Sequence, residues 1–203
     1  MRNKWYLCRR MKLVFATNNA HKLEEVREIF SGKVEVLSLK DIACTAEIPE
    51  TSPTIEGNSL LKARYIYEHY GLDCFSDDTS LEVDALGGSP GVFSARYAGE
   101  PSNPAQNRAK LLKELGDCTD REARFRTVVT LIIGGDIHQF EGIVNGSISQ
   151  QECGEQGFGY DSIFIPQGYT QTFAQIGTIE KNHISHRSKA LAALWEYLNQ
   201  HCL

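Results

Sequence analysis

The sequence predicts an α/β fold built on a mixed central sheet flanked by helices. Residues 12–17 (KLVFAT) are an apolar run, a helical pattern follows them, and residues 33–38 alternate as a second strand, which gives a βαβ-like start. Further along, two long strand patterns at 123–133 and 137–145 are joined by a Gly-Gly-Asp turn, which indicates an antiparallel hairpin. Helices beside such a hairpin favour a mixed sheet, with a ligand site between two lobes.

The remaining elements follow from local periodicity and from turn residues. In the first helix, Leu23, Val26, Ile29 and Phe30 recur at helical spacing. Expected after the second strand are, in order, a polar loop over 43–54, a helix over 55–70, a short strand over 73–76 that leads into an acidic turn, a Gly- and Pro-rich loop over 87–104, a helix over 105–115, a strand over 161–165 and a helix over 186–199.

The 203-residue chain has the composition of a globular protein, with 41% hydrophobic and 23% charged residues. Its net charge of −5 and its scattered basic residues argue against duplex nucleic acid as a partner. No apolar run reaches the ~20 residues that span a bilayer, so a membrane partner is not expected. Six cysteines without a CxxC pair indicate reduced thiols and a cytoplasmic location. Residues 1–10 lack the apolar segment of a signal peptide, and we expect them to be a disordered extension of one domain over 11–203.

A polar segment, TNNAHK at 17–22, lies between the first strand and the first helix. Backbone N–H groups at a helix start are unpaired, and the helix dipole favours an anion there. Thr17 and the two asparagines can donate hydrogen bonds to phosphate oxygens, and Lys22 adds a positive charge. An ordinary asparagine cap beside a solvated lysine would use the same residues, so both interpretations stay open.

Asp77 and Asp78 follow the short predicted strand as a pair of adjacent carboxylates. Carboxylates at a strand end suit a hard cation such as Mg²⁺, or a metal ligand beside a general base. An acidic turn would also use aspartates here.

Three further segments place polar or aromatic side chains where a ligand could contact them. Asn58 and Lys62 are four residues apart and share one helical face, which would point either into a cleft or to solvent. Segment 158–161 (FGYD) sets an aromatic ring on a glycine-rich loop, where it would stack on a base or fill the core. A serine before the last helix is a candidate N-cap that would bring His186 and Arg187 to an accessible edge, or would start an ordinary surface helix.

Five ordered blocks resemble the inosine triphosphate pyrophosphatase family. They are TNNAHK (17–22), GNSLLKAR (57–64), SDDTSLEVDALGGSPGVFSARYAG (76–99), GFGYDSIF (157–164) and EKNHISHRSKAL (180–191). The resemblance implies an α/β fold with an elongated mixed sheet, two lobes around an active-site cleft, and a homodimer. It also implies Mg²⁺-dependent hydrolysis of the non-standard purine nucleotides ITP, dITP and XTP to the monophosphate and pyrophosphate, which cleanses the nucleotide pool.

The resemblance also implies a role for each matching residue. Asp78 would be the general base and a metal ligand, with Lys62 beside it in catalysis, and Asp77 and Glu50 would complete the Mg²⁺ site. Thr79 would lie beside the substrate. The phosphates would be contacted by Thr17, Asn18, Asn19, Ala20, His21, Lys22, Asn58 and Lys62. The base would be framed by Phe158, Gly159, Tyr160, Asp161, Lys181, His186 and Arg187.

Donor–acceptor logic explains the choice of base. Hypoxanthine and xanthine present O6 as an acceptor, which Arg187 or a backbone N–H could satisfy, whereas adenine places an amino donor there. An unpaired buried donor costs roughly 1–3 kcal/mol, so each such contact favours 6-keto purines by about tenfold to a hundredfold.

Two rival functions stay open: a pyrophosphatase for modified pyrimidine or methylated nucleotides, and a non-catalytic nucleotide sensor. One departure from the family is DDTS in place of DDSG, so Ser80 takes a glycine position, which predicts a tighter backbone there.

Overall fold

The computed structural model describes residues 11–202, so the expected disorder of residues 1–10 lies outside the described residues. The strands are β1 (Lys12–Phe15), β2 (Glu35–Leu37), β3 (Cys74–Val83), β4 (Pro90–Gly91), β5 (Glu122–Ile133), β6 (Asp136–Ile148) and β7 (Phe164–Pro166). The helices are α1 (Ala20–Ile29), α2 (Ile55–Tyr70), α3 (Pro104–Leu115), α4 (Phe173–Ile176), α5 (Thr178–Ile184) and α6 (His186–His201), with short 3-10 turns η1 (Lys40–Ile42), η2 (Asp84–Leu86) and η3 (Ser94–Arg96).

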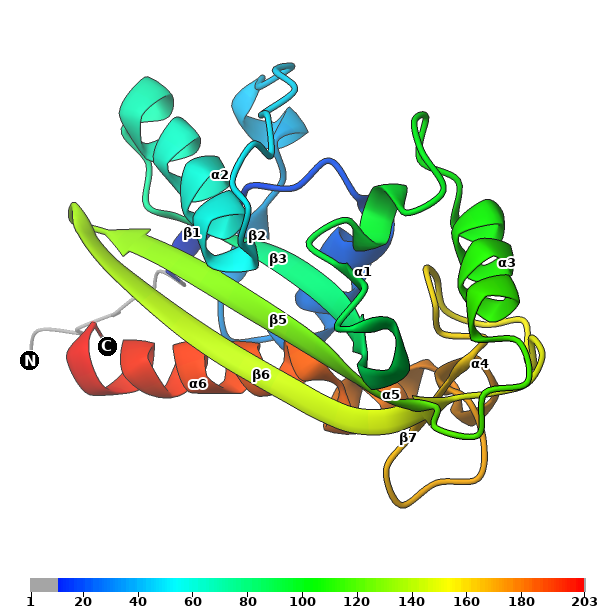
Figure 1. Ribbon diagram of the computed structural model, residues 1–203. Coiled ribbons are helices and arrows are strands. Elements are labelled where there is room, and N and C mark those ends of the chain that lie inside the picture. The colour runs from blue at the N-terminus through cyan, green and yellow to red at the C-terminus, as the bar shows by residue number, and fades with distance from the viewer. Residues whose placement is uncertain (1–10, 203) are drawn as a thin grey trace, which may run out of the picture.

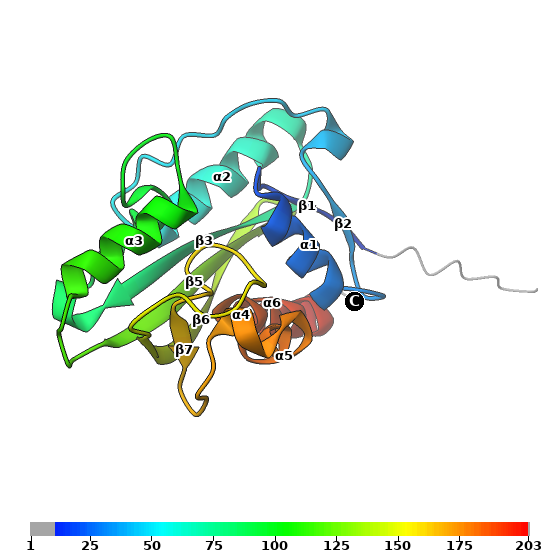
Figure 2. The same ribbon diagram turned by 90° about the vertical axis from the view of Figure 1, so that its right-hand side faces the viewer.

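All seven strands form one sheet in the order β2-β1-β3-β5-β6-β7, with β4 paired to β3. Strand β1 is parallel to β2 and β3, whereas β3, β5, β6 and β7 follow one another antiparallel. Figures 1 and 2 show α2 on one face of this sheet and α6 along the other. The predicted mixed sheet flanked by helices is confirmed.

The parallel part of the sheet creates a place for a ligand. Helix α1 leads from β1 to β2, and α2 leads to β3 on the other side of β1, so the strand order reverses at β1. Ligands of open α/β sheets bind at the carboxyl ends of the strands where the order reverses. Residues 17–22 follow the carboxyl end of β1, so the fold puts this turn at that crevice.

The predicted hairpin is confirmed as β5 and β6. Gly134 and Gly135 have φ values of 57° and 95°, the left-handed conformations that a two-residue hairpin turn requires and that glycine adopts without steric cost. The flanking residues Ile133 and Asp136 pair directly across the turn. The hairpin extends the sheet far beyond its parallel part (Figure 1).

Strand β3 differs from its prediction. The expected strand over 73–76 with an acidic turn is wrong, because β3 runs for 10 residues and pairs with β5 from Cys74 opposite Ile132 to Val83 opposite Ala123. Both faces of β3 are covered, so most of its polar residues are buried. No apolar alternation therefore marks the strand in the sequence. Ser80 lies within this regular ladder, opposite Arg126, so it occupies a strand position and not a turn.

The remaining helices and strands agree with the sequence in part. The helices predicted over 55–70, 105–115 and 186–199 are confirmed as α2, α3 and α6. The strand predicted over 161–165 is wrong at its start, because a turn occupies 161–163 and β7 begins afterwards. Helices α4 and α5 have four and seven residues, too few to show a helical period.

Apolar clusters cover both faces of the sheet. Leu13 and Phe15 of β1 face α1 and α6, where Phe15 stacks on Phe75 at 4.7 Å between ring centroids. Val14 lies on the opposite face, in the cluster beneath α2. A third cluster around Phe125 packs the β7 end of the sheet against α3 and α4. Within residues 11–202, no helix is both long and apolar enough to cross a membrane.

Candidate active site

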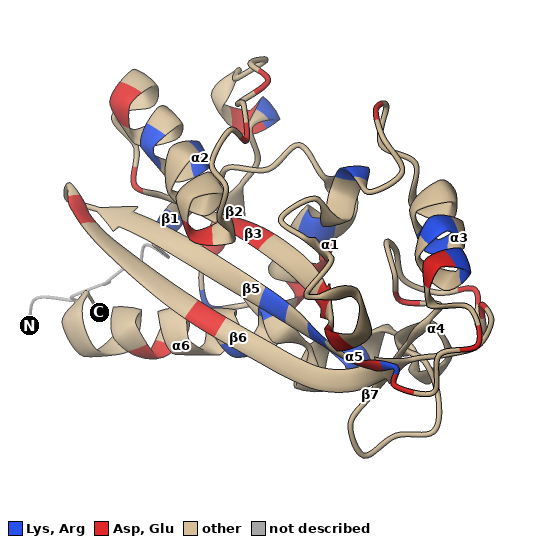
Figure 3. Ribbon diagram, in the orientation of Figure 1, with Lys and Arg blue, Asp and Glu red and all other residues tan. Residues whose placement is uncertain are grey.

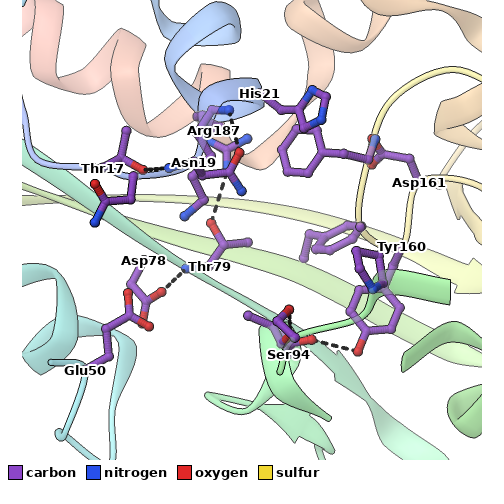
Figure 4. A pocket seen from close by; sticks show the side chains of 18 of the residues that line it. Thr17, Asn19, His21, Glu50, Asp78, Thr79, Ser94, Tyr160, Asp161 and Arg187 are labelled. Carbon is purple, nitrogen blue, oxygen red and sulfur yellow. Dashed lines mark hydrogen bonds between the residues drawn. The ribbon is translucent and has the colours of Figure 1, made fainter. Parts of the chain in front are cut away.

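A cavity of about 500 Å³ lies at the carboxyl end of β1. Figure 4 shows Asp78 beside Glu50 in one part of it and Tyr160 beside Ser94 in another. Most of the predicted site residues meet here. Those that line the cavity are Thr17, Asn18, Asn19, His21, Lys22, Glu50, Lys62, Asp78, Thr79, Phe158, Gly159, Tyr160, Asp161, Lys181, His186 and Arg187.

The turn after β1 presents the start of α1 to the cavity. Asn19 caps the helix, since its Oδ1 accepts a hydrogen bond from the Lys22 N–H at 3.1 Å. Thr17 Oγ1 accepts from the Asn19 N–H, also at 3.1 Å, which fixes the turn. The positive end of the helix dipole therefore faces the cavity, where it favours an anion.

Asp77 and Asp78 point to opposite faces of β3, because successive side chains of a strand alternate. Asp77 accepts from Lys22 Nζ of α1 and from Arg187 Nε of α6, both at 2.9 Å. Asp78 lies on the α2 side, where its Oδ1 is 3.7 Å from Lys62 Nζ. Figure 3 shows acidic positions on β3 next to basic positions on α1 and β5. Asp77 does not line the cavity, so the two carboxylates do not converge as their adjacency in the sequence predicts.

Lys62 connects Asp78 to Glu50. Its Nζ donates to Glu50 Oε1 at 2.5 Å, so two carboxylates flank one ammonium group. Arg96 Nη2 donates to the Glu50 carbonyl at 3.1 Å, which anchors the loop that carries Glu50. Asp78 and Lys62 are each 8% exposed, so their charges interact in a largely water-free environment.

The buried cluster changes the acidity of its members. Burial raises the pKa of Asp78, and the positive charges of Lys62 and Lys22 only partly oppose this. Burial would lower the pKa of Lys62, but the carboxylates of Asp78 and Glu50 raise it above its ordinary value. Asp78 is thereby a better proton acceptor than an ordinary aspartate, and Lys62 stays charged.

The carboxylates in the cavity fit a Mg²⁺ site that differs from the predicted three-carboxylate site. Among residues 11–202, no group of three or more His, Cys, Asp or Glu side chains is placed to hold a metal ion. The predicted set of Glu50, Asp77 and Asp78 is therefore not assembled, because Asp77 is paired with cations on the other face of β3. Glu50 and Asp78 still converge on Lys62, and Mg²⁺ is commonly bound by one or two carboxylates together with substrate phosphates. These two residues fit such a shared site.

A second charged cluster is buried where α1, α5 and α6 meet. Glu25 accepts from Lys181 Nζ at 2.7 Å and from Arg187 Nη1 at 2.5 Å, and Lys181 also donates to Asp161 at 2.7 Å. Sequence reasoning missed Glu25. Its position three residues after Lys22, on the same helical face, is the signal that could have found it.

Phe158 lies beside this second cluster. Lys181 Nζ is 4.6 Å and Arg187 Cζ 5.6 Å from the centroid of its ring, distances at which a cation is attracted to an aromatic face. Asp161 accepts the Phe158 N–H at 2.8 Å, which fixes the turn. The imidazole of His21 stacks on Phe158 with 5.5 Å between centroids and 13° between planes.

The start of α6 is buried, so His186 and Arg187 line the cavity and do not lie at an exposed edge of the protein. The predicted serine cap is confirmed, since Ser185 Oγ accepts the Ser188 N–H at 3.1 Å. His186 is 3% and Arg187 2% exposed. His186 stacks on Phe125 at 4.5 Å between centroids, and burial, reinforced by the charge of Arg187, lowers its pKa well below the ordinary value.

Ala20 and Asn58 join Asp77 as predicted site residues that do not line the cavity. Asn58 is fully buried, and its Oδ1 accepts the Ser52 N–H at 2.9 Å. This hydrogen bond holds the loop between Glu50 and α2, so Asn58 has a structural role near the site. The lining residues that sequence reasoning missed include Ser94, Asn107, Arg108 and Phe125. Ser94 lies inside the block 76–99, where the resemblance assigns it no role, and no motif marks the other three, which come from a predicted helix and a predicted strand.

The fold and the cavity define a class of α/β protein that binds nucleotides. The start of α1 favours an anion, and Phe158 offers an aromatic ring in the same cavity. A sequence model of the Ham1 family matches residues 13–197. The chain therefore belongs to the Ham1 family, which confirms the resemblance found in the five sequence blocks.

Individual relatives agree with this membership. A dITP/XTP pyrophosphatase of Flavobacterium psychrophilum is 54% identical over 92% of this chain and 98% of the relative. One from Porphyromonas gingivalis is 53% identical over 92% and 97%. Among solved structures, the Staphylococcus aureus Ham1 protein superimposes with a TM-score of 0.84 at 36% identity, covering 93% of this chain and 98% of that protein. A HAM1 protein from Coxiella burnetii gives a TM-score of 0.85 at 34% identity, with coverages of 94% and 99%.

Proposed function

We propose that this protein is a hydrolase that cleaves ITP, dITP and XTP to the monophosphate and pyrophosphate. The observation that carries the proposal is the Lys62 cluster with Asp78 and Glu50, which shares one cavity with the anion-binding start of α1 and with Phe158. The names of the relatives at 54% and 53% identity, dITP/XTP pyrophosphatases, support the same substrates.

In this mechanism, the triphosphate lies against the start of α1, and Lys22 and Lys62 offset its negative charge. Asp78 accepts the proton of the water that attacks the α-phosphorus, and its raised pKa suits that role. Pyrophosphate is the leaving group. When bound, Mg²⁺ held by Glu50 and Asp78 would supply further positive charge to the phosphate oxygens.

The base would lie toward Phe158 and be recognised through its O6 acceptor. Arg187 uses Nε and Nη1 for Asp77 and Glu25, and its Nη2 donates to Thr79 Oγ1 at 3.4 Å, so the second Nη2 hydrogen is the one that would serve the base. A donor at this position pairs with the O6 of hypoxanthine or xanthine and opposes the amino group of adenine. The chain would act as a homodimer in the cytoplasm.

The test measures product release from ITP, XTP, dITP, GTP and ATP, with and without Mg²⁺, and identifies both products. We expect monophosphate and pyrophosphate from ITP, dITP and XTP, and only in the presence of Mg²⁺. Orthophosphate as a product, or equal rates with GTP and ATP, would contradict the proposal. Purine-nucleotide binding without any product would instead identify a sensor.

A further inference from the structure

His21 and Phe158 come from distant parts of the chain and close one end of the cavity together. His21 lies in the first turn of α1, and Phe158 lies in the loop before β7. Their rings are almost parallel, with 13° between planes and 5.5 Å between centroids. Both residues line the cavity, so this aromatic pair faces any bound ligand.

The direction of His21 separates it from its neighbour Lys22. Consecutive residues of an α-helix project about 100° apart, because one turn takes 3.6 residues. Lys22 reaches across to Asp77 of β3 at 2.9 Å, whereas His21 reaches the Phe158 ring. The resemblance to the family implies a triphosphate contact for His21. Its ring instead stacks on Phe158, which the same resemblance assigns to the base.

The spacing of the two rings leaves no room for a third ring between them. A planar base stacked on both sides needs roughly 7 Å, two contacts of about 3.5 Å each, and the observed centroid distance is 5.5 Å. The Phe158 ring is backed by the buried cations Lys181 and Arg187. His21 is exposed, so it is the ring that can move outward when a base enters.

We infer that His21 forms the second wall of a base clamp and that a 6-keto purine is held between its imidazole and the Phe158 ring. In the free protein the two rings stack on each other, and the base replaces this contact with two stacking contacts. The inference deepens the proposed function and rests on it. It makes His21 a determinant of base affinity and not of triphosphate affinity.

The test separates the two ends of the substrate by using one ligand for each. Binding of IMP without Mg²⁺ is measured by calorimetry, and inorganic tripolyphosphate is measured as a competitive inhibitor of ITP hydrolysis. In H21A we expect IMP to bind about 5- to 100-fold more weakly, the effect of removing one stacking partner, while tripolyphosphate inhibits as in the wild type. H21F should restore IMP binding, because its ring also stacks, and H21K should not.

The control is H183A, which removes an exposed histidine of α5 that does not line this cavity and should leave both ligands unaffected. Unchanged IMP binding in H21A would overturn the inference. So would weaker binding of both ligands, or weaker tripolyphosphate inhibition that H21K restores, since these results assign His21 to the phosphates. Failure of the proposed function gives a different result, because the wild-type protein would then not hydrolyse ITP, whether or not it binds IMP.

Discussion

Asp77 and Arg187 form an ion pair of 2.9 Å in which each side chain is only 2% exposed. Lys22 adds a second cation to the same carboxylate at 2.9 Å. Burial would raise the pKa of Asp77, but the charges of Lys22 and Arg187 hold it below its ordinary value. Asp77 therefore ties β3 to α1 and α6, whereas its neighbour Asp78 faces the cavity.

We predict that D77N destabilises the fold. The amide keeps the volume of the side chain but removes the charge that Lys22 and Arg187 share, and breaking a buried pair typically costs about 3–5 kcal/mol. Urea unfolding measures the change. The matched control is E35Q, which breaks the exposed pair of Lys12 and Glu35, with side chains 62% and 44% exposed, and should cost less than about 1 kcal/mol. Equal losses in the two variants would show that the Asp77 pair contributes no more than a surface pair.

At Asp78 we expect a loss of activity without a loss of stability. We predict that D78N lowers the rate of pyrophosphate release from ITP by about 10²- to 10⁴-fold, the usual contribution of a general base. Because burial disfavours the Asp78 carboxylate, its replacement should leave the melting temperature unchanged or slightly higher. Near wild-type turnover in a folded D78N protein would rule out its role as the base.

A third prediction concerns the two-carboxylate metal site. Removal of Mg²⁺ with a chelator should abolish turnover. E50Q should raise the Mg²⁺ concentration needed for half-maximal rate, because it removes one of the two carboxylates that would hold the ion. The Mg²⁺ requirement should change much less in D77N, since Asp77 does not line the cavity. An equal increase in both variants would favour the three-carboxylate site.

The sequence is most informative where a residue pattern depends on local geometry. The hairpin follows from two adjacent glycines, and the anion-binding turn follows from asparagines between an apolar run and a helical period. The cap at Ser185 is recognisable because a side chain that accepts from a nearby N–H is a local interaction. Most of the cavity lining could therefore be predicted from ordered blocks of such residues.

Interactions across the fold are harder to predict. The length of β3 depends on β5, which pairs with it along its whole length, and on partners that bury Ser76 and Asp77. Glu25 looks like a surface residue in the sequence, because its cations Lys181 and Arg187 lie more than 150 residues away in the chain. The inward orientation of His186 likewise depends on Phe125. Each of these features needs tertiary contacts that no local pattern contains.

The last prediction concerns pH and follows from His186. Its pKa in the folded protein is well below 6.5 because of burial and the charge of Arg187, whereas the unfolded chain has a pKa near 6.5. At pH values between these two, the unfolded state binds one proton more than the folded state. The free energy of unfolding is therefore unaffected above about pH 7. It falls as the pH drops below about 6.5, by up to roughly 1.4 kcal/mol per pH unit. The carboxylate of Glu25 adds a similar loss only at lower pH, near its ordinary value of 4.5.

Urea unfolding of the wild type and of H186Q between pH 5 and 8 measures this contribution. H186Q should be less stable at pH 8, because it loses the stacking on Phe125, but its stability should change less between pH 6.5 and pH 5. H69Q is the control, since His69 is exposed at the end of α2, and it should keep the wild-type pH profile. If H186Q and the wild type lost stability in parallel as the pH fell, the proton uptake would belong to another group, and His186 would bind its proton equally in the folded and unfolded states.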